Sequence, residues 1–118
     1  MEQRVRLAIT LMEDELRREL SLAELARAVY LSPSRFQHLF KAETGTTPVL
    51  YLRRLRLEHA KGLLETSLLP IKQIMRCVGF KDRSHFEREF KKLYGLTPTQ
   101  YRATALVANT TKEAERRE

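Results

Sequence analysis

Residues 36–48 read FQHLFKAETGTTP, and residues 86–98 read FEREFKKLYGLTP. The two stretches share two phenylalanines, a lysine, a glycine and a Thr-Pro pair at the same spacing. Upstream, the repeat continues through three apolar positions at an offset of forty-nine instead of fifty residues. These positions are Leu22, Leu25 and Val29 in the first copy and Ile71, Ile74 and Val78 in the second. The chain therefore contains a duplicated unit whose second copy has one extra residue in its turn.

Each copy carries the start and stop signals of helices. Ser32-Pro33 and Thr47-Pro48 place a capping hydroxyl before a proline at the first helical position, where the missing N–H needs no partner. Gly45 and Gly95 end helical patterns as left-handed caps. Because the alternation typical of strands is almost absent, the sequence predicts an all-α fold of seven helices. They are expected over about residues 3–19, 22–29, 33–44, 48–66, 71–78, 83–94 and 98–102.

Side-chain caps are predicted at three further helix starts. Ser21 with Glu24, and Thr97 with Gln100, have the spacing of a capping box, in which two side chains satisfy free backbone N–H groups reciprocally. Asp82 stands where its carboxylate can accept from the first turn of the helix that contains Phe86 and Phe90. These signals place the two copies of the repeat on equivalent helix–turn–helix elements.

The charge of the chain favours a polyanionic partner. Its 22 Lys and Arg against 15 Asp and Glu give a net charge of +7 and a pI near 9.9. DNA, RNA and an anionic membrane surface all fit this balance. The single cysteine, Cys77, excludes an internal disulfide and fits a reducing cytoplasm. No apolar run approaches the roughly eighteen residues of a membrane span, and the charged first residues do not resemble a secretory signal.

The helix predicted over residues 33–44 has one apolar and one polar face. Phe36, Leu39 and Phe40 lie at the spacing of a core-facing stripe. The opposite face then carries hydrogen-bonding and basic side chains, which are Ser34, Gln37, His38 and Lys41.

The corresponding helix over residues 83–94 repeats this division. Phe86, Phe90 and Leu93 are expected to point inward. The outward residues are Ser84, Glu87, Arg88 and Lys91, with Arg83 at the helix start. Such side chains suit base edges in a major groove: Arg pairs with guanine, Gln with adenine, and Glu accepts from the cytosine amine. One polar face alone is ordinary for a surface helix, but two equivalent faces on a basic chain favour DNA.

The helix predicted over residues 48–66 joins the two copies. At about 1.5 Å per residue it spans about 29 Å. Successive major-groove segments on one face of a duplex lie about 34 Å apart, so one chain is expected to reach two of them. This explains why a single chain would carry two copies of the unit.

The chain resembles the DNA-binding domain of the AraC/XylS family of bacterial transcription regulators over about residues 5–105. The resemblance rests on SLAELARAVYLSPSRFQHLFKAETGTTPVLYLRRLRLEHAKGLLE and on PIKQIMRCVGFKDRSHFEREFKKLYGLTPTQYR. Two positions depart from the pattern. Met75 replaces the small residue that the first copy has at Ala26, and Tyr30 stands where the second copy has Gly79, a residue suited to positive φ.

The resemblance implies two subdomains joined by a long helix, sequence-specific binding of double-stranded DNA, and activation of transcription through RNA polymerase in many members. It implies base contacts from Ser34, Gln37, His38, Arg83, Ser84, Glu87 and Arg88. It implies phosphate contacts from Arg35, Lys41, Arg53, Lys81 and Lys91. No cofactor is implied. The expected location is the bacterial cytoplasm, at the nucleoid.

Other classes of function fit the residues less well. An enzyme is not expected, because His38, His59, His85 and Cys77 form no metal or nucleophile constellation. Cys77 is interpreted as a buried structural thiol. The repeated phenylalanines face inward, so they offer no stacking platform for RNA bases. Leu57 and the Leu68-Leu69 pair are too few for a membrane-surface face. A helical protein-interaction or RNA-binding module stays the alternative.

One DNA-binding domain is expected over residues 1–106. It comprises a first helix–turn–helix at about 21–45, the linker helix at about 47–66 and a second helix–turn–helix at about 70–95. Residues 107–118 read as a polar, disordered tail. Family members usually carry a ligand-sensing or dimerisation domain as well. The chain is therefore expected to be an excised C-terminal domain, monomeric by itself, with a parent that dimerises through the missing domain; a small stand-alone regulator is the other possibility.

Overall fold

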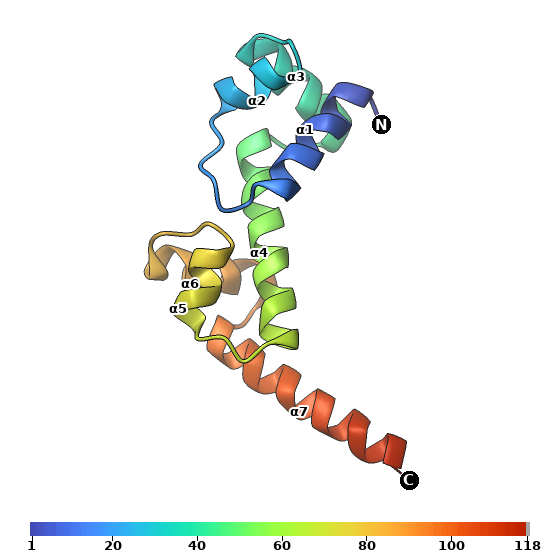
Figure 1. Cartoon of the computed structure of the whole chain (residues 1–118), viewed down its shortest axis with the longest axis vertical. Helices are drawn as coiled ribbons and strands as arrows, with labels where there is room; N and C mark the ends of the chain where they lie inside the picture. The colour runs from blue at the N-terminus through green and yellow to red at the C-terminus, as the bar shows by residue number, and fades with distance from the viewer. Residues whose placement is uncertain (118) are drawn as a thin grey trace. The chain divides into compact units, whose positions relative to one another are not determined.

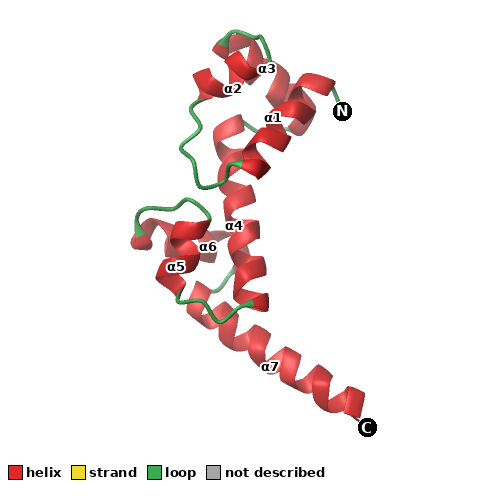
Figure 2. Cartoon of the chain, viewed as in Figure 1, coloured by secondary structure: helices red, strands yellow, loops and turns green. Residues whose placement is uncertain are grey.

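A computed structural model describes the backbone of residues 1–117 and the side chains of residues 1–108. Within residues 1–117 the secondary structure consists of seven α-helices joined by loops, without a strand (Figures 1 and 2). This confirms the predicted all-α fold. The helices are α1 (Gln3–Asp14), α2 (Leu22–Ala28), α3 (Pro33–Thr44), α4 (Pro48–Thr66), α5 (Ile71–Cys77), α6 (Arg83–Tyr94) and α7 (Pro98–Arg117).

The predicted caps are formed, except that the Ser21–Glu24 box is only half made. The Glu24 N–H donates to Ser21 Oγ at 3.1 Å, but the Glu24 carboxylate lies 3.5 Å from Arg18 Nη2 instead of returning to the Ser21 N–H. Ser32 Oγ accepts from the N–H of Arg35 at 3.2 Å, and the Asp82 carboxylate accepts from the N–H of His85 at 3.1 Å. The box at α7 is complete: the Thr97 N–H donates to Gln100 Oε1 at 3.0 Å, and the Gln100 N–H donates to Thr97 Oγ1 at 3.2 Å. Local side-chain chemistry therefore fixes where α3, α6 and α7 begin.

The chain divides into two compact units, residues 1–56 and 57–118, and the boundary falls within α4. In the first unit, α2 packs against α3, and α1 packs against both. Phe36 and Phe40 of α3 are fully buried, and the Phe40 ring meets the Tyr51 ring edge-on at 5.3 Å. The buried core residues are Val5, Ala8, Ile9, Met12, Leu25, Ala26, Val29, Phe36, Phe40 and Leu52.

The second unit has its own core, in which α5 packs against α6 and α6 against α7. Met75 occupies the place of Ala26 and is buried. Leu57, weighed above as part of an exposed apolar face, is buried as well. The buried core residues are Leu57, Ala60, Leu64, Ile74, Met75, Val78, Phe80, Phe86 and Phe90.

Leu93 does not point inward, contrary to the prediction from α6 periodicity. It is 39% exposed. At the offset of fifty it corresponds to Glu43, an exposed residue of α3, so the position lies at the edge of the buried face in both copies. Cys77, expected to be buried, is only partly so.

The first helix is shorter than predicted. It ends at Asp14 instead of Glu19. The following segment is held by Arg56 of α4, whose guanidinium donates to the carbonyls of Leu16 and Arg18 at 3.0 Å each. Burial lowers the pKa of Arg56, and the nearby Glu19 carboxylate opposes this shift.

The last helix is longer than predicted. Its backbone continues past Arg102 to Arg117, so the short final helix expected from the sequence was wrong in extent. No glycine or proline follows Pro98, and Ala, Glu, Lys and Arg are strong helix formers. Of the tail predicted over residues 107–118, the side chains of residues 109–118 and the backbone of Glu118 lie outside the described residues.

Tyr30 has a backbone conformation that favours glycine. Its φ is 60°, and the N–H of Leu31 donates to the carbonyl of Ala26 at 2.9 Å, which closes the end of α2. In the second copy Gly79 has φ 95°, and the N–H of Phe80 makes the equivalent bond to the carbonyl of Met75.

We expect Tyr30→Gly to raise the free energy of unfolding by about 1 kcal/mol, because it removes the steric strain of a left-handed Tyr. The side chain is 96% exposed, so little packing is lost. A thermal melt followed by circular dichroism measures the change, and Gly79→Ala should shift the melt in the opposite direction. A lower melting temperature for Tyr30→Gly would show that the phenol ring stabilises the fold.

Candidate nucleic-acid interface

Helix α3 presents a polar stripe from the first unit. Phe36 and Phe40 fix its rotation by entering the core, which leaves the opposite face in solvent. The residues predicted on that face, Ser34, Gln37, His38 and Lys41, are all exposed. Their spacing of three and four residues keeps them on one side of the helix.

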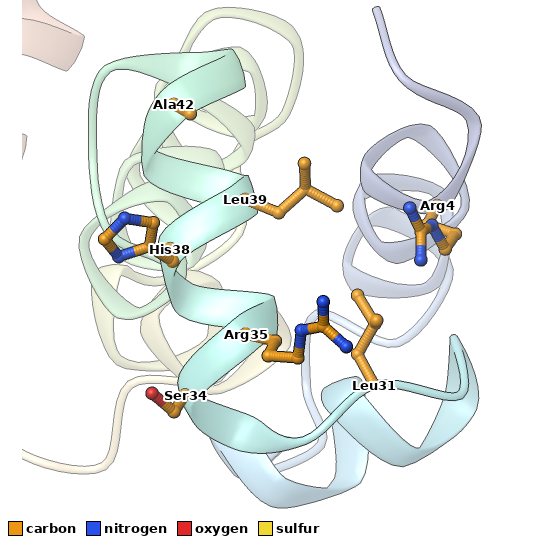
Figure 3. A pocket seen from close by; sticks show the side chains of 7 residues that line it. All are labelled: Arg4, Leu31, Ser34, Arg35, His38, Leu39 and Ala42. Atoms are coloured by element: carbon orange, nitrogen blue, oxygen red, sulfur yellow. The ribbon is translucent and has the colours of Figure 1, made fainter.

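A pocket of about 430 Å³ lies between α3 and the first turns of α1. Its lining includes Leu31, Leu39 and Ala42 as apolar residues, with Arg4 and Arg35 as cations. Figure 3 shows Arg35 and Leu39 pointing from α3 toward α1, whereas Ser34 and His38 lie on the rim and turn away. Arg35 therefore occupies a different side of α3 from the predicted base-reading residues.

Arg4 was not predicted as a site residue. Its Nε lies 3.0 Å from Glu2 Oε1, and its backbone N–H donates to the same carboxylate, so the pKa of Glu2 is lowered. Glu2 thereby caps α1 and fixes the start of the helix from which Arg4 reaches the pocket. The sequence gives no local signal for this placement, because it depends on how α1 packs against α3.

Helix α6 presents the corresponding stripe from the second unit. Phe86 and Phe90 are fully buried, and the Phe86 ring packs against Phe80 with centroids 5.2 Å apart. Arg83, Ser84, Arg88 and Lys91 are exposed, while Glu87 is partly exposed.

Two of the predicted residues on α6 pair with each other. Arg83 Nε donates to Glu87 Oε1 at 3.0 Å, one helical turn apart. Oppositely charged residues at i and i+4 commonly pair on helix surfaces, so the sequence spacing alone would have indicated this contact. Arg88 and Lys91 add two further cations to the same face of α6.

The remaining predicted phosphate contacts differ in accessibility. Lys81, which precedes the α6 cap Asp82, is exposed, as are Arg35, Lys41 and Lys91. Arg53 of α4 is only partly exposed, and its charge acts on neighbouring Arg56 to lower the pKa of that guanidinium. Each compact unit therefore contributes both a polar stripe and nearby cations.

Other kinds of site find little support in the described part of the chain. Among those residues no group of three or more His, Cys, Asp and Glu could hold a metal ion. None of the helices, as far as they are described, combines the length and apolarity needed to cross a bilayer.

The two units define a class of protein: each has a short helix, a turn and a second helix with an outward polar face, which is a helix–turn–helix element. The family model described as "Helix-turn-helix domain" matches residues 25–104. A crystal structure of a transcriptional regulator with an AraC-type DNA-binding domain, from Chromobacterium violaceum, has a TM-score of 0.82 and 32% identity. The match covers 86% of this chain and 91% of that one.

The chain belongs to the AraC/XylS family of helix–turn–helix DNA-binding domains. The DNA-binding domain of AdpA, solved with a target DNA, has a TM-score of 0.82 and 25% identity, and the match covers 87% of this chain and 93% of that one. The arabinose operon regulatory protein of Escherichia coli strain K12 is 39% identical over 104 residues, or 87% of this chain and 36% of that protein. The chain thus spans about a third of the length of such curated relatives.

Proposed function

We propose that the chain is the sequence-specific DNA-binding domain of a bacterial transcription activator, and that α3 and α6 are its recognition helices. The observation that carries the proposal is that both helices have the same two faces. One face holds two buried phenylalanines, and the other holds polar or basic side chains. AdpA supports the duplex partner, because its domain was solved on a target DNA. The names of several relatives describe transcriptional regulators or activators.

Base readout is assigned to the exposed stripes. Gln37 can form two hydrogen bonds with adenine and Arg88 two with guanine, while Ser34, His38 and Ser84 can bond more than one base. Phosphate contacts are assigned to the cations beside the stripes, because Lys and Arg at the edge of a recognition helix reach the backbone. These cations are Arg4, Arg35, Lys41, Arg53, Lys81 and Lys91.

The duplication is proposed to let one chain occupy two successive major-groove segments. Most helix–turn–helix proteins obtain two such contacts by dimerisation, with half-sites about one helical turn apart. The nineteen residues of α4 extend about 29 Å, close to this repeat of about 34 Å. For the regulator as a whole we propose contact with RNA polymerase and dimerisation through a further domain. We also propose that it acts in the bacterial cytoplasm and has no catalytic activity.

A pair of substitutions on α6 tests base readout. Arg88→Ala should relax selectivity at one base pair and weaken specific binding by about 1–3 kcal/mol, because a bidentate base contact is lost. Lys91→Ala should weaken binding to all sequences alike, since a phosphate contact carries no sequence information. Competition binding against a panel of single-base-pair variants measures both. Equal losses for Arg88→Ala on specific and scrambled duplexes would contradict base readout by this residue.

A further inference from the structure

The pair between Arg83 and Glu87 changes what each side chain can do in a groove. Arg83 Nε lies 3.0 Å from Glu87 Oε1, and the side chains are 55% and 37% exposed. Both residues stand on the outward face of α6, at its first and fifth positions. A carboxylate that already accepts a charged hydrogen bond is less available to the amine of a cytosine.

The geometry of the guanidinium decides which of its N–H donors remain available for a base. Arginine has five N–H groups in a planar fork, and a contact at Nε uses one edge of that plane. Within the described residues, Nη1 and Nη2 of Arg83 have no hydrogen-bond partner. These two nitrogens form the fork that bonds guanine O6 and N7 in a bidentate contact.

We propose that Glu87 is a positioning residue, which holds the Arg83 guanidinium so that Nη1 and Nη2 read a guanine in the major groove. The inference rests on the proposed function of α6. Glu87 limits the rotamers of a long side chain, so less conformational freedom is lost when the base contact forms. Arg83 in turn compensates the Glu87 carboxylate, which would otherwise be repelled by the DNA phosphates.

The first unit lacks an equivalent of the Arg83–Glu87 pair. The positions that correspond to Arg83 and Glu87 are Pro33 and Gln37, so α3 has neither the guanidinium nor the carboxylate. Gln37 instead offers an amide, which suits adenine. The two recognition helices are therefore expected to prefer different base sequences. The guanine contacted by Arg83 is expected in the groove segment that α6 occupies.

A double-mutant cycle tests the positioning role on a duplex selected by the chain. Arg83→Ala and Glu87→Ala should each lose the preference for guanine at the same base pair, by about 5- to 150-fold, which is the range of one bidentate contact. The double variant should lose no more than either single variant, because the two residues act as a unit. Removing the guanine N7 acceptor with 7-deazaguanine should weaken wild-type binding and leave binding by Glu87→Ala unchanged.

Binding to random-sequence duplex separates positioning from a charge effect. Glu87→Ala removes a carboxylate, so its binding to random DNA should rise while its preference for guanine falls. Glu89→Ala is the matched control on the same helix. It removes the same charge, and Glu89 faces His85 at 3.9 Å instead of Arg83, so the guanine preference should persist. Circular dichroism melts of all variants exclude loss of fold as the cause.

Two results would overturn the inference. The first is a shift at different base pairs for Arg83→Ala and Glu87→Ala with additive effects, which would make Glu87 a base contact itself. The second is an unchanged guanine preference in Glu87→Ala. If Arg88→Ala still shifts a base preference in that case, the proposed function stands and only the positioning role fails. If no variant, including Arg88→Ala, alters any base preference, base readout by α6 fails as well.

Discussion

Replacing Phe86 by alanine should lower the free energy of unfolding of the second unit by about 3–5 kcal/mol. The ring is fully buried, with centroids 5.2 Å from Phe80 and 6.0 Å from Phe90. Its removal leaves a cavity that α5 and α6 can only partly fill, so the lost transfer free energy and the lost contacts add. Because the same ring fixes the rotation of α6, specific DNA binding should fall together with stability.

Chemical denaturation followed at 222 nm measures this change. Leu93→Ala is the control on the same helix, and it should alter stability by less than about 1 kcal/mol because Leu93 is 39% exposed. Phe36→Ala should produce the equivalent loss in the first unit, where that ring is also fully buried. A denaturation curve of Phe86→Ala that coincides with the wild-type curve would show that the outward face of α6 has been assigned wrongly.

Affinity for a specific duplex should fall steeply with salt. With about 6–10 phosphate contacts, log K should decrease with log salt at a slope of about 0.9 per contact. Affinity should then drop by about 10³–10⁵ between about 50 and 200 mM salt. The physical reason is the release of counterions when lysines and arginines neutralise phosphates, which the net charge of +7 makes possible.

A titration by fluorescence anisotropy at four or more salt concentrations gives the slope. Lys91→Ala should reduce the magnitude of the slope by about one, since one phosphate contact is removed. Ser84→Ala changes no charge and should leave the slope unaltered. A slope near zero would mean that phosphates contribute little, and the assignment of the cations around α3 and α6 would be wrong.

Much of the fold was predictable because it is encoded in local chemistry. Caps such as Ser32, Asp82 and the Thr97–Gln100 box act within one turn of the backbone, so short stretches of sequence reveal them. The end of α1 was not predictable in this way. Its following segment is held by Arg56, about forty residues further along the chain, and such a contact leaves no periodic signal.

The faces of the recognition helices were predicted from spacing, while their contacts were only partly foreseen. Phe36, Phe40, Phe86 and Phe90 identify the buried side, so the opposite sides follow from geometry. The i, i+4 spacing of Arg83 and Glu87 predicts that these residues pair with each other. Each was instead interpreted as a separate base contact. The position of Arg4 beside α3 depends on packing between helices that are distant in sequence.

Selection of bound duplexes from a random pool, followed by hydroxyl-radical footprinting, tests most directly whether two helices of one chain read two groove segments. We predict an enriched site about two helical turns long, with two protected blocks about 10 base pairs apart. Substitutions on α3 should alter one block, and those on α6 the other. A single protected block that is altered by variants of both helices, or no enrichment over random sequence, would contradict the proposed mode of binding.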